Sequence, residues 1–327
     1  MLSRVVRRVL AIPCKFPAGR RLARRVRSRR LAILMYHGVT AEPQQVFNWC
    51  QLHAAEFEKQ IGLISREYQV LPLTEVVDRL GRRAPLPDRT ACLTFDDGFR
   101  NVFATAYPIL KRYQVPATVF LVTSLIGTRQ PAWPDRLYFA VANTTRCSVR
   151  FQGVSWQLEN SRKRSATHRA LARELKALPI DVQERRLAEL LQELGERPVP
   201  EDSPLATMDW REVDELARSG LFHFGSHTHT HPILSQCSPD RQRDELLLSR
   251  NILRDRLGTA DLLAYPNGTR KDFTDATKQF VAELGYRAAV TTVSGLERLR
   301  GNLFELRRVG IGADTSLSQF ELRLLGL

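Results

Sequence analysis

Cysteine is scarce in this sequence and shows no paired pattern. Five of the 327 residues are cysteines, and no two of them form a Cys-x-x-Cys motif. They are scattered along the chain as Cys14, Cys50, Cys92, Cys147 and Cys237. A disulfide framework normally uses an even number of cysteines, so free thiols in a reducing cytoplasm are the simpler explanation.

Long apolar runs are also missing from the chain. No stretch reaches the roughly 20 consecutive apolar residues that a transmembrane helix needs. The apolar residues near the start are too few, and too often interrupted by arginine, for a convincing secretory signal. We therefore expect a cytoplasmic protein, either free or attached peripherally to the inner face of the membrane.

Acidic residues are absent from the first 30 positions, which hold eleven of the 49 lysines and arginines. The other 38 basic residues nearly balance the 35 acidic ones, so most of the net charge of +14 belongs to residues 1–30. Nucleic-acid-binding domains carry their positive charge on a recognition surface or motif. Because residues 31–327 are nearly neutral and contain no such motif, we do not expect specific nucleic-acid binding.

The basic segment 1–30 has two interpretations. Its apolar residues recur at helical spacing between arginines, and an amphipathic helix of this kind binds anionic membrane surfaces. Pro13 and Pro17 interrupt the pattern. A disordered, solvated basic arm explains the composition equally well.

Further along, an apolar run ends abruptly in two carboxylates. Thr90–Phe95 is followed by Asp96, Asp97 and Gly98, which is typical of a buried strand that opens into a loop. Ligands of α/β folds bind at the carboxyl ends of strands. A turn at Gly98 would direct both carboxylates toward one pocket. Two such carboxylates repel each other unless a cation lies between them or one holds a proton, so the pattern predicts a metal partner.

A second apolar run leads into a histidine-rich loop. Residues 223–231 contain four of the seven histidines of the chain. His227 and His231 are four positions apart, so one helical turn or a tight loop would bring them to the same side. Two imidazoles and one carboxylate leave positions open for water, as in catalytic rather than structural metal sites.

Predicted strands alternate with predicted helices along most of the chain, which indicates a parallel sheet or barrel of the α/β class. Residues 127–207 break this alternation with a hairpin around Gly153 and a charged helical stretch. We interpret them as an insertion in a catalytic domain of residues 31–327. Such an insertion could be a lid or substrate wall, a partner surface or a tolerated elaboration.

Thr94–Gly98 and His227–Pro232 together resemble the paired signature of the polysaccharide deacetylases, carbohydrate esterase family 4. The resemblance extends from about Leu31 to the end of the chain. It implies a distorted parallel (β/α) barrel, a divalent metal and removal of an N-acyl group from an amino sugar. By position, it implies Asp96 as general base and Asp97, His227 and His231 as metal ligands. Zinc is the expected metal, and cobalt, manganese or nickel also suit these ligands.

One motif departs from the family pattern at residues 264–268. Tyr265, Pro266 and Asn267 stand where the family carries a motif lining its groove, and the resemblance implies that they bind substrate. Ala264 replaces an arginine that normally orients the catalytic aspartate, and Asn267 replaces an aromatic residue. Asp96 therefore needs another support, or it is held less tightly.

The family's late Leu-x-His motif is also altered, because the corresponding residues are Leu306, Arg307 and Arg308. No histidine follows His231, so the general acid must come from elsewhere. Some exopolysaccharide deacetylases resembling this chain carry a Tyr-His motif on the first strand. We therefore predict His37, at the end of the apolar run 31–36, as general acid, with a structural role as the alternative.

The predicted activity is removal of an N-acetyl group from a polysaccharide or a lipid-linked glycan of the cell envelope. Two other functions remain open from the sequence. The chain could be a carbohydrate-binding member with weakened or lost catalysis, given the two altered motifs, although its metal-ligand pattern is intact. It could also be a deformylase of a lipid-linked amino sugar.

Overall fold

The computed structural model describes residues 30–298 and 301–326 of the chain. The basic segment lies outside these residues except for Arg30, so both interpretations of it stay predictions. None of the helices in the described part is long and apolar enough to cross a membrane. The four cysteines in that part are free thiols.

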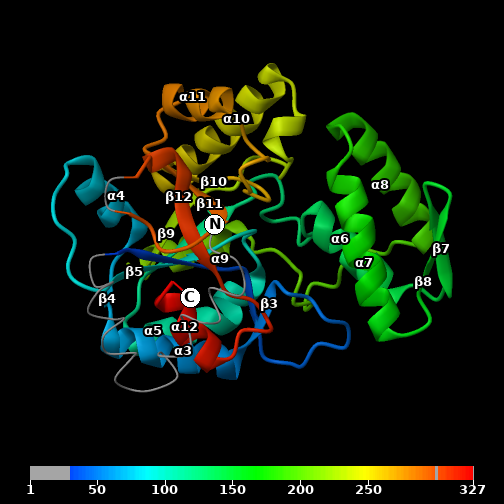
Figure 1. Cartoon of the computed structure of the whole chain (residues 1–327), viewed down its shortest axis with the longest axis horizontal. Helices are drawn as coiled ribbons and strands as arrows, with labels where there is room; N and C mark the ends of the chain where they lie inside the picture. The colour runs from blue at the N-terminus through cyan, green and yellow to red at the C-terminus, as the bar shows by residue number, and fades with distance from the viewer. Residues whose placement is uncertain (1–29, 299–300, 327) are drawn as a thin grey trace.

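A closed barrel of parallel strands forms the centre of the molecule (Figure 1). Its sheet has eight strands in the order β1-β12-β11-β10-β9-β6-β5-β4, and an additional pairing of β1 with β5 closes the ring and leaves β4 outside it. This confirms the parallel barrel predicted from the sequence. The strands are β1 (Ala32–Tyr36), β4 (Gln69–Val70), β5 (Thr90–Phe95), β6 (Ala117–Leu121), β9 (Phe222–Ser226), β10 (Leu262–Ala264), β11 (Ala288–Ser294) and β12 (Leu306–Gly310).

Most barrel strands are continuous apolar runs because both of their faces are buried. All six residues of β5 and all five of β1 and β6 are buried. Helices cover the outside of the barrel. A π-helical turn, η2 (Val102–Ala106), directly precedes α5. The surrounding helices are α3 (Ala54–Glu67), α4 (Leu73–Gly81), α5 (Tyr107–Tyr113), α9 (Trp210–Arg218), α10 (Pro239–Leu257), α11 (Asp275–Glu283) and α12 (Leu317–Leu324).

The first strand ends where the apolar run over residues 31–36 ends. β1 ends at Tyr36, and the chain then leaves the barrel as β2 (Gly38–Thr40), which pairs with β3 (Gln51–His53). A Cβ atom on Gly38 would lie 2.3 Å from the end of the Gln51 side chain, which would have to move to make room for it. His37 lies at the break between the two strands.

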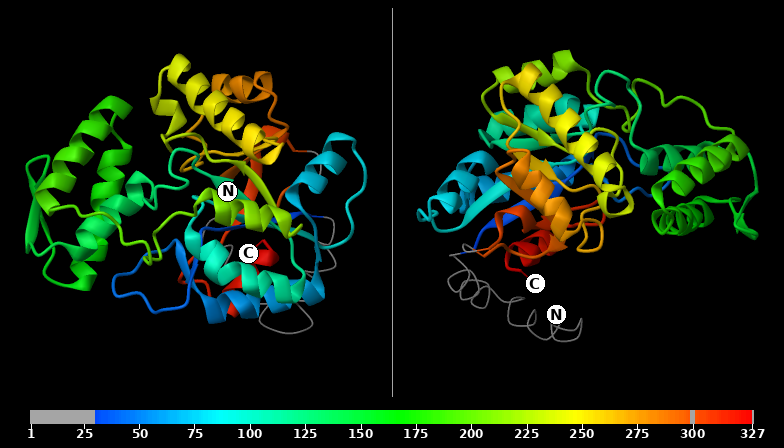
Figure 2. Two further views of the ribbon diagram at one scale, coloured as in Figure 1. Left: turned by 180° about the vertical axis from the view of Figure 1, so that it is seen from behind. Right: turned by 90° about the horizontal axis from the view of Figure 1, so that it is seen from above.

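The residues between β6 and α9 form a helical lobe beside the barrel, as all three views show (Figures 1 and 2). The lobe contains α6 (Trp133–Asn143), the hairpin β7 (Ser148–Phe151) and β8 (Val154–Gln157), α7 (Ser161–Lys176) and α8 (Ile180–Leu194). Its helices and hairpin pack around their own apolar cluster, which includes Leu137, Leu171 and Leu190. Gln152 and Gly153 both have positive φ at the hairpin turn, as a tight two-residue turn requires.

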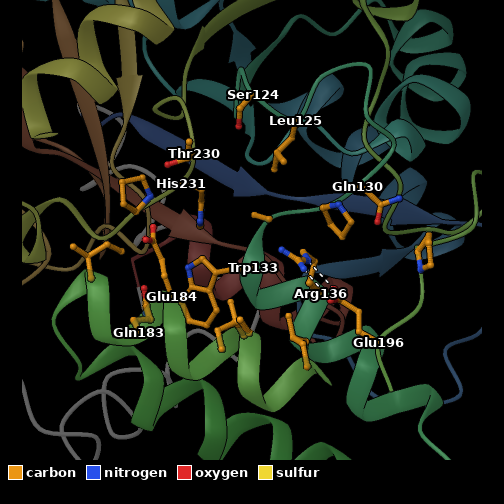
Figure 3. A pocket seen from close by; sticks show the side chains of 18 of the residues that line it. Ser124, Leu125, Gln130, Trp133, Arg136, Gln183, Glu184, Glu196, Thr230 and His231 are labelled. Atoms are coloured by element: carbon orange, nitrogen blue, oxygen red, sulfur yellow. Dashed lines mark hydrogen bonds and ion pairs between the residues drawn. The ribbon is translucent and has the colours of Figure 1, made fainter. Parts of the chain in front are cut away.

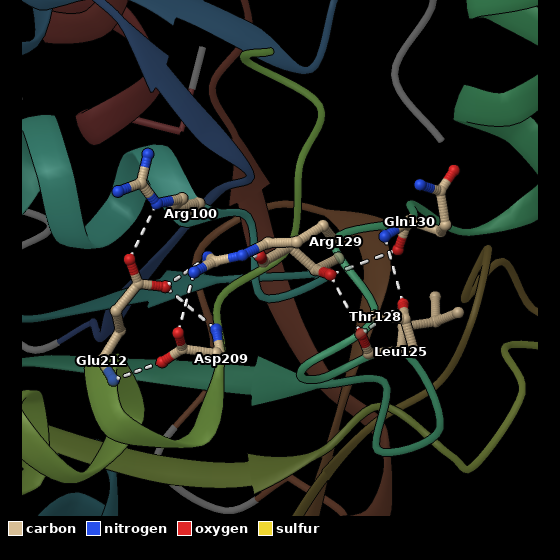
Figure 4. Close-up of polar contacts among 8 residues, drawn as sticks. Arg100, Leu125, Thr128, Arg129, Gln130, Asp209 and Glu212 are labelled. Carbon is tan, nitrogen blue, oxygen red and sulfur yellow. Dashed lines mark hydrogen bonds and ion pairs between the residues drawn. The ribbon is translucent and has the colours of Figure 1, made fainter. Parts of the chain in front are cut away.

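A network of ion pairs ties the entry and the exit of the lobe together (Figure 4). Arg129, on the entering segment, donates to Asp209 at 2.8 Å and to Glu212 at 2.7 Å, and Arg100 also donates to Glu212. The exiting segment is joined to the loop after β5, because the amide of Met208 donates to the carbonyl of Gly98 at 3.0 Å. The base of the lobe is therefore fixed beside the Asp96–Gly98 loop.

Candidate metal and catalytic site

Three predicted ligands, from two strand ends, meet at the carboxyl edge of the barrel. Asp97 follows β5, His227 follows β9, and His231 lies four residues further along. The Nε2 atoms of His227 and His231 are 3.5 and 3.4 Å from Oδ1 of Asp97. One ligand atom from each residue lies within 4.8 Å of the others, and all three residues are buried. This spacing suits a single small cation.

Left-handed backbone conformations orient these side chains toward the site. Asp97 has φ 70° and Gly98 has φ 71°, so the turn begins one residue earlier than the glycine alone predicts. Thr228 and His231 also have positive φ, at 64° and 66°. Non-glycine residues adopt this conformation at an energetic cost, and such strain clusters at functional sites. The His227–His231 segment is therefore a tight loop rather than a helical turn.

Glu245 of α10 holds this histidine loop in place, and sequence reasoning did not identify it. Its carboxylate accepts hydrogen bonds from the amides of His229 and Thr230 at 2.9 and 2.8 Å. The remaining histidine of the loop, His229, contacts the hydroxyl of Thr123 at 3.0 Å and is not part of the ligand group. A glutamate in a helix carries no local signal of such a role, so only the fold reveals it.

The tautomer of His227 prepares it for a metal. Its Nδ1 is 2.7 Å from the carbonyl of Ala264, and a carbonyl can only accept, so Nδ1 carries the proton. The lone pair of Nε2 then faces Asp97, which is how a hydrogen-bonded histidine presents itself to a metal. Burial lowers the pKa of both His227 and His231, which keeps their imidazoles neutral. Neutral imidazoles and a carboxylate are a donor set that fits zinc.

Asp96 is held by Arg308, which supplies the support that Ala264 cannot. The two side chains form a bidentate pair with both N–O distances at 2.7 Å, and Arg308 is fully buried. Arg308 also donates to the carbonyl of Thr291 and the hydroxyl of Thr94. Burial alone would raise the pKa of Asp96, but the Arg308 guanidinium outweighs it and holds that pKa well below its usual range. The sequence places Arg308 only at the position of the missing histidine and does not predict this role.

His37 lies in the same cavity as Asp96 and the three ligands. Its ring packs edge-on against Trp49 with the centroids 5.7 Å apart, and its buried Nδ1 has no hydrogen-bond partner among the described residues. Burial lowers the pKa of His37 to about 4, against an opposing effect of Asp96. A structural histidine normally has its buried nitrogens bonded, and His37 lacks such a bond at Nδ1.

The cavity over this site has a volume of about 670 Å³. Of the three residues predicted to bind substrate, Asn267 and Tyr265 line it, whereas Pro266 is not among its lining residues. The hydroxyl of Tyr265 donates to the carbonyl of Phe304, and its ring stacks on Phe273 in the core. Its phenol is therefore committed to packing, and Asn267 is the member of this group with a polar side chain facing the cavity.

A second cavity of about 680 Å³ lies between the lobe and the barrel (Figure 3). Trp133 and His231 line both cavities, so the two adjoin at the metal site. The wall on the lobe side includes Arg136 of α6, which donates two hydrogen bonds to Glu196, and Gln183 and Glu184 of α8. The lobe therefore forms one wall of a second cavity that adjoins the first at His231.

Comparison with known proteins identifies one family. The family model described as "Polysaccharide deacetylase" matches residues 83–289, more than half of the chain. A curated relative, the poly-beta-1,6-N-acetyl-D-glucosamine N-deacetylase of Staphylococcus aureus (strain MSSA476), is 36% identical over 74 residues. That segment is 22% of this chain and 25% of the relative. The chain thus matches only a quarter to a third of the length of the first curated relatives.

Solved structures resemble nearly the whole chain. The Streptococcus pyogenes deacetylase PplD, solved in complex with acetate, has a TM-score of 0.61 and 22% identity, covering 90% of this chain and 98% of that one. IcaB from Ammonifex degensii has a TM-score of 0.59 and 19% identity, covering 91% of this chain and 97% of that one. At these identities, the likeness establishes a shared fold.

Proposed function

Because this chain belongs to the polysaccharide deacetylase family, we propose that it is a metal-dependent hydrolase that removes the N-acetyl group from an amino sugar of a glycan. The observation that supports this most is the meeting of five side chains in one cavity. A group able to hold a cation stands beside an ion-paired carboxylate and a histidine with a free nitrogen. These residues are Asp96, Asp97, His227, His231 and His37.

Asp97, His227 and His231 would hold the metal. We propose zinc, with cobalt, manganese or nickel as metals that the same ligands accept. When bound, the metal supplies Lewis-acid activation of the acyl carbonyl and of water. Burial, together with the neighbouring carboxylates of Asp135 and Asp96, raises the pKa of Asp97. A positive charge at this position would favour the ionised carboxylate.

Asp96 would accept the proton of the attacking water. Arg308 fixes both of its carboxylate oxygens, so the base is already oriented when substrate enters. General-base catalysis contributes about 10²- to 10⁴-fold. Asp96→Asn should therefore lower turnover by about that factor while metal content stays unchanged.

His37 would give a proton to the departing nitrogen. At neutral pH its imidazole is uncharged before the reaction, because burial lowers its pKa to about 4. Negative charge that develops on the substrate beside it favours the protonated form, so the proton that Asp96 takes from water can pass to His37 and from there to the leaving amine. Without that proton, an amine is a poor leaving group.

The substrate would be an N-acetylated glycan. The Staphylococcus aureus relative is named for poly-beta-1,6-N-acetyl-D-glucosamine, and we propose a polymer or oligomer of N-acetylglucosamine ahead of a lipid-linked sugar. Acetate release from such oligomers tests this, with and without a chelator and with zinc restored afterwards. Formate released from an N-formylated sugar in place of acetate would indicate a deformylase. Binding without any acyl release would indicate a member that has lost catalysis.

A further inference from the structure

Two charged residues of the lobe line the cavity that contains the metal ligands. Asp135 lies in the first turn of α6, and Lys176 is the last residue of α7. Both face the cavity that also contains Asp97, His227 and His231. The lobe is an insertion relative to the alternating strands and helices, so the barrel alone would lack these two charges.

The opposite charges of Asp135 and Lys176 attract each other but form no direct salt bridge. Across residues 30–298 and 301–326, no ion pair involves Asp135 or Lys176. Asp135 is 6% exposed and accepts one hydrogen bond, from Nδ2 of Asn48 at 3.2 Å. The ammonium of Lys176 has three N–H groups, and its hydrogen bond within the protein goes to Oδ1 of Asn267 at 2.6 Å. Buried charges are normally paired, so both side chains retain bonding capacity for something in the cavity.

A purely structural role explains less of this arrangement. The first turn of a helix favours an acidic residue and the last turn favours a basic one. However, the hydrogen bond that the Asp135 carboxylate accepts comes from Asn48 rather than from an amide of the first turn of α6. Lys176 extends from α7 to Asn267 on the loop after β10 rather than to the carbonyls of its own helix. Burial raises the pKa of Asp135 to about 6, which shows how poorly its surroundings stabilise the charge.

The chemistry of the cavity wall indicates what these groups would bind. Trp49 and Trp133 supply apolar rings, Asp135 supplies acceptors, and Lys176 supplies donors. The opposite charges of Asp135 and Lys176 cancel, which disfavours a phosphate because the carboxylate would repel it. Sugar hydroxyl groups both donate and accept, so an uncharged polyhydroxy ring satisfies a carboxylate and an ammonium together.

We propose that Asp135 and Lys176 are specificity-determining residues that bind hydroxyl groups of the acylated sugar. This inference rests on the proposed function and names the part of the substrate that the lobe recognises. Asp135 accepts from one hydroxyl and Lys176 donates to another, which orients the ring so that its acyl group lies against Asp96 and the ligand group. The lobe is then a substrate wall.

The test compares two substrates on the same enzyme. One is an N-acetylglucosamine oligomer, and the other is para-nitrophenyl acetate, an activated ester without hydroxyl groups. Asp135→Asn and Lys176→Met should each lower kcat/KM on the oligomer by about 10- to 100-fold, the effect of losing a hydrogen bond to a charged group. Both variants should affect the ester much less than the oligomer, because the ester has no hydroxyl groups that contact these residues. A change common to both substrates reports the effect of the two charges on Asp97.

Matched controls come from the same lobe. Asp181→Asn removes an exposed carboxylate from the first turn of α8, and Lys163→Met removes an exposed ammonium from α7. Neither residue lines the cavity, so both controls should keep the oligomer-to-ester ratio of the wild type. An unchanged ratio in Asp135→Asn and Lys176→Met, including an equal loss on both substrates, would overturn the inference and leave the proposed function standing. A wild type that hydrolyses the ester but no acetylated sugar would overturn both.

Discussion

Arg308 and Asp96 form a bidentate ion pair inside the barrel, although 212 positions separate them in the chain. The pair joins β12 to the end of β5 through the two N–O contacts of 2.7 Å. β1 lies between these strands and pairs with both. The orientation of the proposed base therefore depends on correct closure of the barrel.

Removing Arg308 should destabilise the protein strongly. Arg308→Met leaves Asp96 buried without its partner, and breaking a buried pair in this way costs about 3–5 kcal/mol of unfolding free energy. Urea denaturation of wild type and variant measures the loss. Arg307→Met is a matched control, because Arg307 is the preceding residue on β12 and is only partly buried. Neutralising the orphaned acid in the double variant Arg308→Met/Asp96→Asn should recover part of the stability, and failure to recover any would contradict the pairing argument.

The two ligand histidines should differ sharply from the third histidine of their loop. Removing a hydrogen-bond partner of a metal ligand lowers metal affinity by about 10- to 100-fold. His227→Ala or His231→Ala removes the ligand itself, so each should lower the affinity by more than that. Activity should fall with metal content. His229→Ala should change neither, because its side chain contacts Thr123 outside the ligand group. Elemental analysis of the purified variants measures occupancy, and full occupancy in His231→Ala would remove that residue from the site.

His37 should matter only where the leaving group needs a proton. His37→Ala should lower turnover on an N-acetylated sugar by about 10²- to 10⁴-fold, the usual contribution of a general acid. Hydrolysis of para-nitrophenyl acetate should be nearly unaffected, because its leaving group departs as an anion. Metal content should also stay constant. Equal losses on amide and ester would indicate that His37 supports the site without donating a proton.

His168 should make the lobe sensitive to acid. Burial lowers its pKa to about 4, with a smaller opposing effect of its contact to the carbonyl of Pro134 and further lowering by Lys176 and Arg169. Its ring also packs on Tyr138. Between pH 6.5 and 4, the unfolded chain binds a proton at this position that the folded chain does not, so unfolding free energy falls as pH falls.

His168→Gln cannot take up that proton but keeps an N–H that can reach Pro134. The loss of stability between pH 7 and 4.5 should therefore be smaller in this variant than in the wild type, by about 2–3 kcal/mol. Both proteins should be measured without metal, so that protonation of the ligands does not release a bound ion from one of them. Parallel stability curves for the two proteins would show that His168 already titrates normally in the fold.

The sequence by itself determined the barrel and the group of predicted catalytic residues. Apolar runs that end in Asp96 and Asp97, in His227 or in His37 identify the carboxyl ends of three strands. In a parallel barrel these ends share one edge, so residues far apart in the chain come together there. Strand alternation and the paired motifs were therefore sufficient to predict the barrel and the meeting of these residues at one edge of it.

Only the tertiary structure decided what surrounds that group. In the sequence, Arg308 is an ordinary basic residue at the histidine position of the late motif, and its contact with Asp96 depends on the pairing of β12, β1 and β5. Asp135 and Lys176 reach the cavity because the lobe, fixed at its base, leans across the edge of the barrel. Local patterns report burial and strand direction, whereas contacts between distant side chains depend on strand register and on the packing of whole elements. That is why the grouping of the candidate site residues could be predicted from the sequence, whereas the residues that hold Asp96 and line the cavity wall could not.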